Sequence, residues 1–212
     1  DGRTLYFSAN RAKDWEREPL NTEVYALDLA SDALTALTRR NGPDAAPIVS
    51  PDGRRIAYLG FDDKALGFQN NLLYVMDRDG GGGHAITAGL DRSIDDAQWA
   101  ADSRSLYIRY DERGSTRVAR VTLDGKLHVV ATGLTGEENA RPYSGGEFSV
   151  ARSGAVAFTS GTPLRPSDIS ITQGSVTRRL TRLNENLLAA KTLGQVRPLA
   201  VTAPDKRAID AW

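Results

Sequence analysis

The chain has 212 residues, enough to bury a substantial core in one or two domains, and its 40% hydrophobic and 25% charged residues are ordinary for a globular protein. Its 27 basic and 27 acidic residues cancel and form no long run of one sign, which argues against a nucleic-acid or polyanionic partner. The absence of cysteine excludes disulfides and thiolate metal sites. It leaves the compartment open between periplasm and cytoplasm, with the periplasm slightly favoured.

The two ends of the chain bear on its origin. No apolar stretch approaches the length of a membrane span, and no signal peptide is present. The chain begins at Asp1-Gly2 rather than at a methionine, so we expect a fragment of a longer protein. Missing targeting signals then say little about the natural protein.

A repeated motif runs along the chain. Related segments, each an Asp-Gly-type turn followed by consecutive apolar residues, occur at 1–7, 52–58 and 102–108, with a shortened version at 153–158. The aligned apolar positions are 51, 50 and 50 residues apart, at Leu5, Ile56, Leu106 and Val156. A fixed period of this length predicts a repeat architecture.

Each repeat has the same predicted order of short strands. An inner strand comes first, at 46–49, 97–99 and 147–150, and an Asp-Gly-type turn follows it, since Asp and Gly tolerate positive φ. The second strand is apolar on both faces, as at 56–59. The third lies at 24–27, 73–76, 118–121 and 168–171. The fourth, more polar strand ends near Leu37-Thr38, Ile86-Thr87, Val129-Val130 and Leu180-Thr181.

Four antiparallel strands per repeat of about 50 residues predict the blades of a β-propeller. The fold class is therefore all-β: a partial propeller of about four blades, at approximately 1–42, 43–94, 95–142 and 143–190, from a larger propeller. A β-sandwich has a similar strand density but does not repeat in sequence. The first blade lacks its inner strand, and open blade faces of this kind suggest a homo-oligomer.

Two groups of motifs resemble known families. Ser50-Pro51-Asp52-Gly53 and the segment 73–80 resemble the repeats of Tol-system propellers and of prolyl oligopeptidase propellers. Segments 163–169 and 179–188 resemble the last blade of the acylaminoacyl-peptidase-like branch of the prolyl oligopeptidase family. Segment 194–212 is similar to that family's entry into its α/β-hydrolase domain, except that Asp205-Lys206 stands where Asp-Gly is usual.

The resemblance implies a serine peptidase that removes dipeptides or acylated residues from short peptides. Residues 1–190 would form propeller blades that gate the active site and line the substrate cavity. Residues 191–212 would lead into an α/β-hydrolase domain, with the catalytic residues beyond Trp212. The implied partners are that hydrolase domain and a short peptide, with no nucleic acid and no membrane. The alternative is a Tol-like propeller that binds protein partners without doing chemistry.

No catalytic residue is assigned within the chain, and no activity is expected for it alone. The Gly-x-Ser-x-Gly motif is absent, and His84 and His128 have no triad context. Gly80–Gly83 lacks the helix and lysine of a phosphate loop, and Asp77–Gly80 lacks the remaining ligands of a calcium loop. We predict no metal and no cofactor.

Paired glutamates, Glu137 and Glu138, are the candidate substrate-binding residues. In dipeptidyl peptidases of the wider family, paired glutamates of the propeller hold the free amino terminus of the substrate, and the resemblance implies the same role here. Two carboxylates bind an ammonium group through charge-assisted hydrogen bonds. Plain surface charge is the alternative. Long loops at 9–21 and 60–71, with Trp15, Phe61 and Phe68, are expected on the same side, where repeat proteins place binding function.

Overall fold

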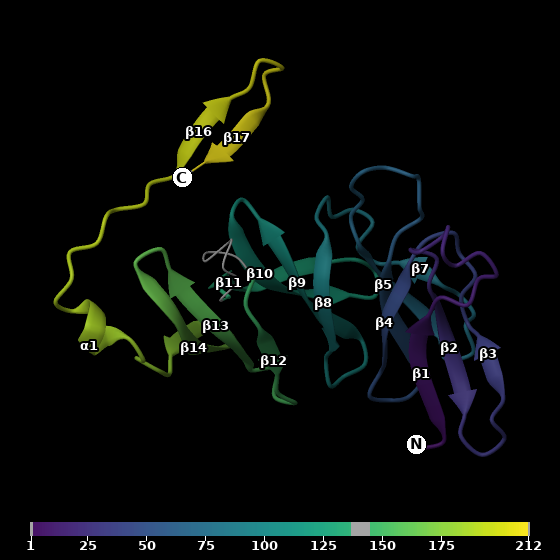
Figure 1. Ribbon diagram of the computed structural model, residues 1–212. Helices are drawn as coiled ribbons and strands as arrows, with labels where there is room; N and C mark the ends of the chain where they lie inside the picture. The colour runs from purple at the N-terminus through teal and green to yellow at the C-terminus, as the bar shows by residue number, and fades with distance from the viewer. Residues whose placement is uncertain (1, 137–144, 212) are drawn as a thin grey trace. The chain divides into compact units, whose positions relative to one another are not determined.

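A computed structural model describes residues 2–136 and 145–211, and it is an all-β structure of antiparallel sheets (Figure 1). Two compact units are distinguished. Unit 1 comprises residues 1–108 and 120–128, and unit 2 comprises residues 109–119 and 129–212. The helix α1 (Glu185–Leu188) is the only one within the described ranges. No helix in these ranges is long and apolar enough to span a membrane.

Unit 1 contains two complete small sheets, each in chain order. The first has three strands, β1 (Thr4–Ala9), β2 (Glu23–Asp28) and β3 (Leu34–Ala36). The second has four, β4 (Asp44–Val49), β5 (Arg55–Gly60), β6 (Leu72–Asp77) and β7 (His84–Ala85). All neighbours pair antiparallel, in the strand order that the repeat predicts.

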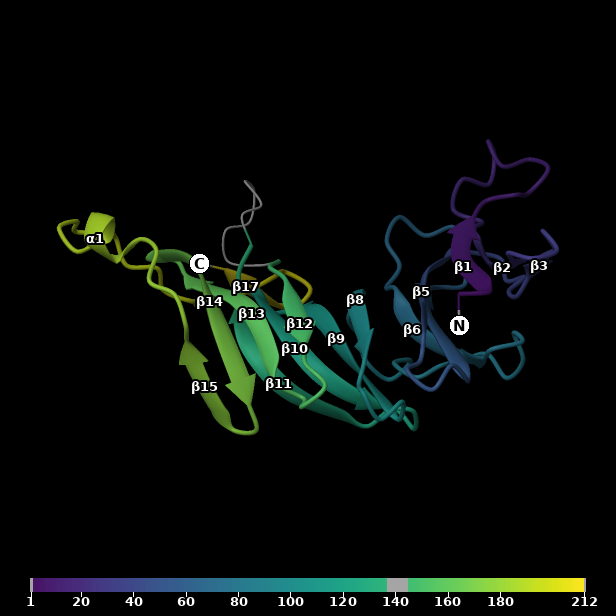
Figure 2. The same ribbon diagram turned by 90° about the horizontal axis from the view of Figure 1, so that it is seen from below.

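The second half of the chain forms a larger sheet than predicted. Its strands are β8 (Ile94–Trp99), β9 (Ser105–Glu112), β10 (Ser115–Thr122), β11 (Leu127–Leu134), β12 (Phe148–Val150), β13 (Val156–Thr162), β14 (Arg165–Gln173) and β15 (Val176–Arg179). The sequence predicts two separate sheets here, but β11 continues to Leu134, which pairs with Ser160 of β13. One residue pair therefore joins the two sets of strands. Figure 2 shows β13, β14 and β15 side by side.

The core of unit 1 lies between its two small sheets. Val24 of β2 packs in one buried cluster with residues of β5 and β6, namely Ile56, Tyr58, Tyr74 and Met76. Ile56, Ala57 and Tyr58 are consecutive and all buried. Because successive strand residues point to opposite faces, β5 is covered on both faces, as its apolar sequence predicts.

Side-chain contacts dock one repeat against the next within unit 1. The Asp52 amide donates to Ser103 Oγ at 3.1 Å, and Trp99 Nε1 donates to the Ile48 carbonyl at 3.1 Å. Each contact joins residues 51 positions apart. The period found in the sequence is therefore also the period of contacts between neighbouring repeats.

A threonine hydroxyl ends the strand ladder in three repeats. Thr38, Thr87 and Thr181 each follow the fourth strand or its remnant, and the Oγ1 of each accepts a hydrogen bond from a third-strand amide. The donors are the amides of Val24, Leu73 and Ile169, at 2.9, 2.9 and 2.8 Å. These hydroxyls satisfy backbone donors that a short outer strand would leave unpaired.

A separate hairpin is formed by β16 (Leu199–Thr202) and β17 (Ala208–Ala211). Register pairs Val201 with Ile209, so both side chains lie on one face, and both are exposed. Lys206 takes φ +68° in the turn, where the sequence has Lys in place of the usual Gly. The hairpin expected from segment 194–212 is thus present, with a lysine in the left-handed region.

Candidate functional site

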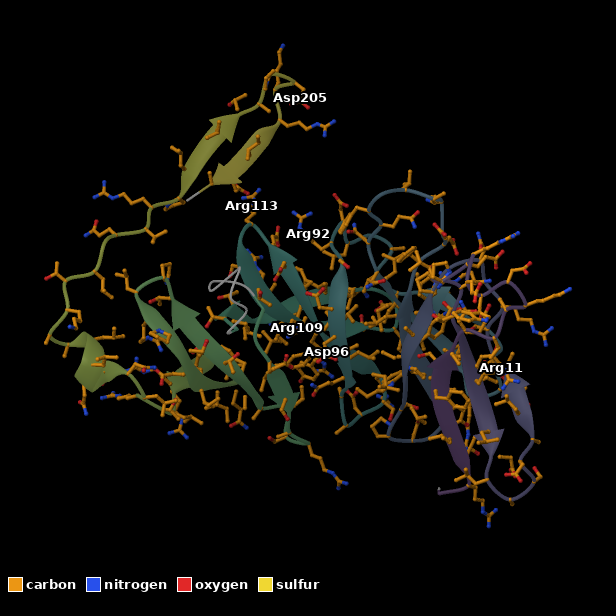
Figure 3. The ribbon with its side chains drawn as sticks, in the orientation of Figure 1. Arg11, Arg92, Asp96, Arg109, Arg113 and Asp205 are labelled. Carbon is orange, nitrogen blue, oxygen red and sulfur yellow. The ribbon has the colours of Figure 1, made fainter. Side chains whose placement is uncertain are left out.

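Glu137 and Glu138 lie outside the described residues, but both ends of their connector are described. Thr159 Oγ1 of β13 donates to the Thr135 carbonyl at 2.8 Å and accepts from the Glu147 amide at 3.0 Å. Arg109, labelled in Figure 3, donates to the Gly146 carbonyl and pairs with Glu147 at 3.1 Å. The fold therefore brings the two ends of this connector together over β13 and fixes them there.

The two long loops of unit 1 share an anchor at their bases. The Gly42 amide donates to Asn21 Oδ1 at 3.4 Å, and the Asp63 amide donates to the Asn41 carbonyl at 2.8 Å. The connector 39–43 thus contacts the end of one loop and the start of the other. Trp15 and Phe68 are 57% and 77% exposed, so neither is packed under its loop.

A buried ion pair lies beside that connector. Asp44 is fully buried and accepts a hydrogen bond from Arg40, which also pairs with Asp62 at 3.2 Å. The guanidinium carbon of Arg40 stands 3.9 Å from the ring centroid of Tyr74, a cation–π contact. The packing is tight here, because a Cβ at Gly60 would collide with the Pro43 carbonyl oxygen. Sequence reasoning missed this cluster, since no motif marks it.

Burial controls the electrostatics of this cluster. Burial raises the pKa of Asp44, against the lowering effect of the hydrogen bond and charge of Arg40. Burial likewise raises the pKa of Glu23, although Thr38 donates a hydrogen bond to its carboxylate. Burial also raises the pKa of Tyr58 to about 12. The cluster is a structural ion pair at the junction of two sheets.

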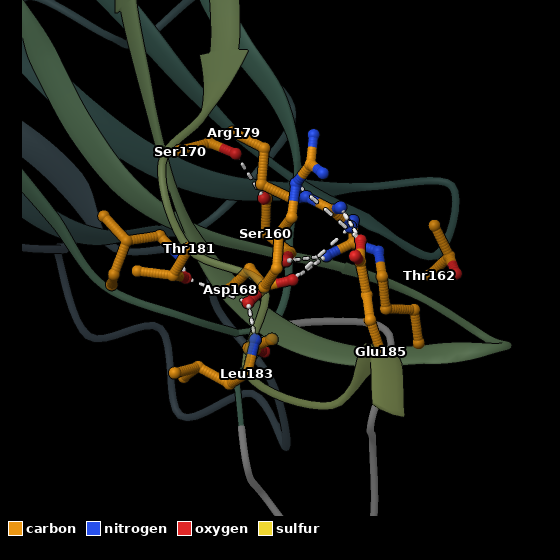
Figure 4. Close-up of polar contacts among 12 residues, drawn as sticks. Ser160, Thr162, Asp168, Ser170, Arg179, Thr181, Leu183 and Glu185 are labelled. Carbon is orange, nitrogen blue, oxygen red and sulfur yellow. Dashed lines mark hydrogen bonds and ion pairs between the residues drawn. The ribbon is translucent and has the colours of Figure 1, made fainter. Parts of the chain in front are cut away.

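A second polar cluster fixes the exit of the chain from the last sheet (Figure 4). The buried Asp168 carboxylate accepts through Oδ1 from Thr181 Oγ1 at 2.9 Å and from the Leu183 amide at 3.0 Å. Its Oδ2 pairs with Arg165 at 2.7 Å and with Arg179 at 3.5 Å. The Leu183 hydrogen bond foremost, together with Thr181 and Arg165, lowers the pKa of Asp168 against the raising effect of burial. Both oxygens are occupied, so Asp168 is an anchor rather than a proton acceptor.

An apolar cavity of about 390 Å³ lies next to this anchor, within unit 2. One wall is the turn from β13 to β14, and the other is α1 with the segment that follows it. Its apolar lining consists of Pro163, Leu164, Pro166, Leu188, Leu193 and Val196. Gly136, Thr162, Arg165 and Ser167 complete it. The volume is within the range of about 300–1,000 Å³ typical of small-molecule pockets.

The residues considered for metal or phosphate binding belong to ordinary turns. The Gly80 amide donates to the Asp77 carbonyl at 2.9 Å, and the Gly81 amide donates to Asp79 Oδ1 at 2.9 Å. His84 and His128 are exposed. Among the described residues, no group of three or more His, Asp or Glu side chains is arranged to hold a metal ion.

No protein-family model matches the chain, but curated proteins similar to it are peptidases. Dipeptidyl-peptidase 5 of Arthroderma otae is 24% identical over 234 residues, covering 100% of this chain and 30% of that protein. Dipeptidyl-peptidase 5 of Porphyromonas gingivalis is 28% identical over 139 residues, covering 63% of this chain and 20% of that protein. The chain is a distant homologue of dipeptidyl-peptidase 5. It spans less than a third of the length of these relatives.

Solved structures give the fold of this homologue. The Pyrococcus horikoshii acylaminoacyl peptidase matches at TM-score 0.75 and 17% identity, over 98% of this chain and 30% of that one. The β-propeller domain of the Trilobed protease from Pyrococcus furiosus matches at TM-score 0.58 and 16% identity, over 85% and 55%. TolB from Acinetobacter baumannii matches at TM-score 0.59 and 19% identity, over 85% and 41%. The antiparallel sheets are therefore those of a β-propeller.

Proposed function

We propose that the chain is a non-catalytic segment, about four blades long, of a larger propeller in a serine peptidase of the prolyl oligopeptidase family. It gates access to the active site and forms one wall of the cavity for short peptides. The observation that carries this proposal is the alignment with dipeptidyl-peptidase 5 over the whole chain. That alignment includes the hairpin β16–β17, for which a propeller that only binds proteins has no evident use.

In this proposal residues 1–190 are propeller blades, and residues 191–212 lead into an α/β-hydrolase domain of the same protein. The hairpin supports the idea, because its apolar side chains at Leu199, Val201 and Ile209 are exposed. An isolated two-stranded hairpin is marginally stable in water. The hydrolase sheet would supply the cover that these side chains require.

The proposal is tested with dipeptidyl and acylaminoacyl fluorogenic substrates. The purified 212-residue chain is expected to hydrolyse none of them, because the nucleophile belongs to the hydrolase domain. The longer natural polypeptide is expected to hydrolyse at least one class and to be inactivated by a serine-directed phosphonate. Activity that stays with the purified chain, or a longer polypeptide with no peptidase activity, would overturn the proposal.

Glu137 and Glu138 have a role to be tested in the longer polypeptide. In the double variant Glu137→Gln/Glu138→Gln, kcat/KM for dipeptidyl substrates with a free amino terminus is expected to fall about 10- to 100-fold, since a charge-assisted hydrogen bond contributes about 1.5–3 kcal/mol. Acetylated substrates are expected to react as before. The control is Asp32→Asn/Asp79→Asn, which removes two exposed charges from turns outside both long loops. Equal losses in both double variants would contradict the role.

The second candidate function is a Tol-like binding module, favoured by the structural match to TolB. It predicts a longer polypeptide that captures a protein partner and hydrolyses no peptide. The same substrate panel therefore separates the two functions.

A further inference from the structure

The cavity between the β13–β14 turn and the exit segment has the lining of a ligand site. Six of its ten lining residues are proline, leucine or valine. Three of them, Leu164, Leu193 and Val196, remain 42–44% exposed. A ligand that covers such side chains gains about 25 cal/mol per Å² of apolar surface removed from water.

The neutral polar groups of the lining are occupied by contacts within the chain. The hydroxyls of Ser167 and Thr135 hydrogen-bond at 2.7 Å, and Ser167 Oγ also contacts the Thr135 carbonyl oxygen at 3.0 Å. Thr162 Oγ1 accepts from the Leu164 amide at 3.2 Å. These hydroxyl groups are therefore already used within the chain, and Arg165 is the one charged residue of the lining that can hold a polar group of a ligand.

The segment 162–197, which supplies nine of the ten lining residues, carries a net positive charge. Residues 162–197 contain six basic side chains, Arg165, Arg178, Arg179, Arg182, Lys191 and Arg197, against two acidic ones, Asp168 and Glu185, a net charge of +4. Asp168 neutralises part of this charge at Arg165. An apolar hollow whose one charged lining residue is an arginine favours a ligand that is apolar at one end and anionic at the other.

We propose that this cavity binds the C-terminal residue of a short peptide when that residue is apolar, with its side chain among Leu164, Leu188 and Leu193 and its carboxylate toward Arg165. Asp168 acts as a positioning residue, because it holds Arg165 in one wall and, through Leu183, the start of the other. This inference deepens the proposed function by naming the end of the peptide and the kind of residue that the propeller segment selects.

The test is a titration of the ¹⁵N-labelled 212-residue chain followed by NMR, with acetyl-Ala-Leu as the probe. Saturable binding is expected with a Kd of about 1 mM or tighter for a ligand of this size. The shifts should be confined to amides of the cavity lining, including Leu164 and Leu188. Acetyl-Ala-Leu-amide, which lacks the carboxylate, and acetyl-Ala-Ser, which lacks the apolar side chain, should each bind at least fivefold more weakly.

Two variants and one control test whether the peptide binds in this cavity. Leu164→Asp and Arg165→Gln are each expected to weaken binding of acetyl-Ala-Leu at least tenfold. The control Leu127→Asp alters a leucine of similar exposure in β11, outside the cavity, and should bind like the wild type. Unchanged amide resonances of unit 2 strands outside the cavity lining, such as those of β12, show that Leu164→Asp and Arg165→Gln fold. If Arg165→Gln disturbs the fold, Arg165→Lys replaces it, because it keeps the charge and should bind within threefold of the wild type.

Several results would overturn the inference: equal binding of the acid and the amide, unchanged binding in Leu164→Asp, or no shift at the cavity up to about 10 mM probe. The titration requires no catalysis, so it is independent of the proposed function. Binding here together with an inactive longer polypeptide would remove the peptidase proposal alone. An active longer polypeptide with no binding here would remove this inference alone.

Discussion

Ser103 stands where Gly53 stands one repeat earlier, and both adopt positive φ, +57° and +70°. A left-handed conformation costs a non-glycine residue roughly 1–2 kcal/mol. Ser103 has a compensating contact, because its hydroxyl accepts the Asp52 amide of the preceding repeat. The positive φ of Ser103 is unfavourable within its own turn and is explained by the contact with the repeat beside it.

A second single residue, Glu23, makes the stability of the protein depend on pH. Burial raises the pKa of Glu23 in the folded protein above 4.5. The contribution of this group to the free energy of unfolding is therefore fully present below pH 4.5, and it is lost as the pH rises through the folded-state pKa. In Glu23→Gln this loss is removed, while the amide oxygen can still accept from Thr38. The free energy of unfolding of the variant, relative to wild type, should therefore be higher at pH 7 than at pH 4.

Urea unfolding at both pH values measures that difference. The groups that face Glu23 are Thr38, Asp44 and Arg40. The control Glu16→Gln changes an exposed carboxylate and should show no such dependence. A relative stability for Glu23→Gln that is independent of pH, or that falls as pH rises, would contradict the prediction.

At the scale of elements, the turn of the β16–β17 hairpin holds a lysine in a conformation that glycine adopts freely. Lys206→Gly should relieve about 1 kcal/mol of backbone strain, since glycine has no Cβ to clash. Amide exchange within β16 should slow roughly fivefold, as 1.4 kcal/mol corresponds to a factor of ten. Arg197→Gly, at a position without positive φ, should not slow it. Faster exchange in Lys206→Gly would show that the turn adopts another conformation.

The order and approximate positions of the strands were predictable from the sequence, because the inner, second and third strands carry apolar patterns at a fixed period. The junction of β11 with β13 was not, since a single residue pair, Leu134 with Ser160, leaves no pattern. The role of Asp168 was equally hidden. Its four partners come from three segments, and only the fold brings them together. The cavity was missed because proline and leucine in a turn and a connector resemble ordinary loop sequence.

At the scale of the whole molecule, β1 is an end strand of its sheet in the described structure. Leu5 on this strand is half exposed. An apolar edge strand pairs readily with another chain. We expect the 212-residue chain to self-associate, and Leu5→Lys should weaken the association about tenfold, because a charge on an edge strand opposes pairing.

Sedimentation velocity from about 10 to 200 µM measures this association. Leu29→Lys, at a leucine of similar exposure just beyond β2, is the matched control and should associate like the wild type. A wild-type chain that stays monomeric throughout, or equal weakening by both variants, would contradict the role of the β1 edge.

The threonine that follows the outer strand in three repeats has a consequence for how such domains change over evolution. Because the Thr87 hydroxyl accepts from the Leu73 amide, β7 closes its sheet with two residues only. Shortening the outer strand in this way still leaves the Leu73 amide with a hydrogen-bond acceptor. Insertions and deletions between the third and fourth strands are then compatible with an intact interior. We expect related sequences to differ most in length at these places, while the threonine itself is retained.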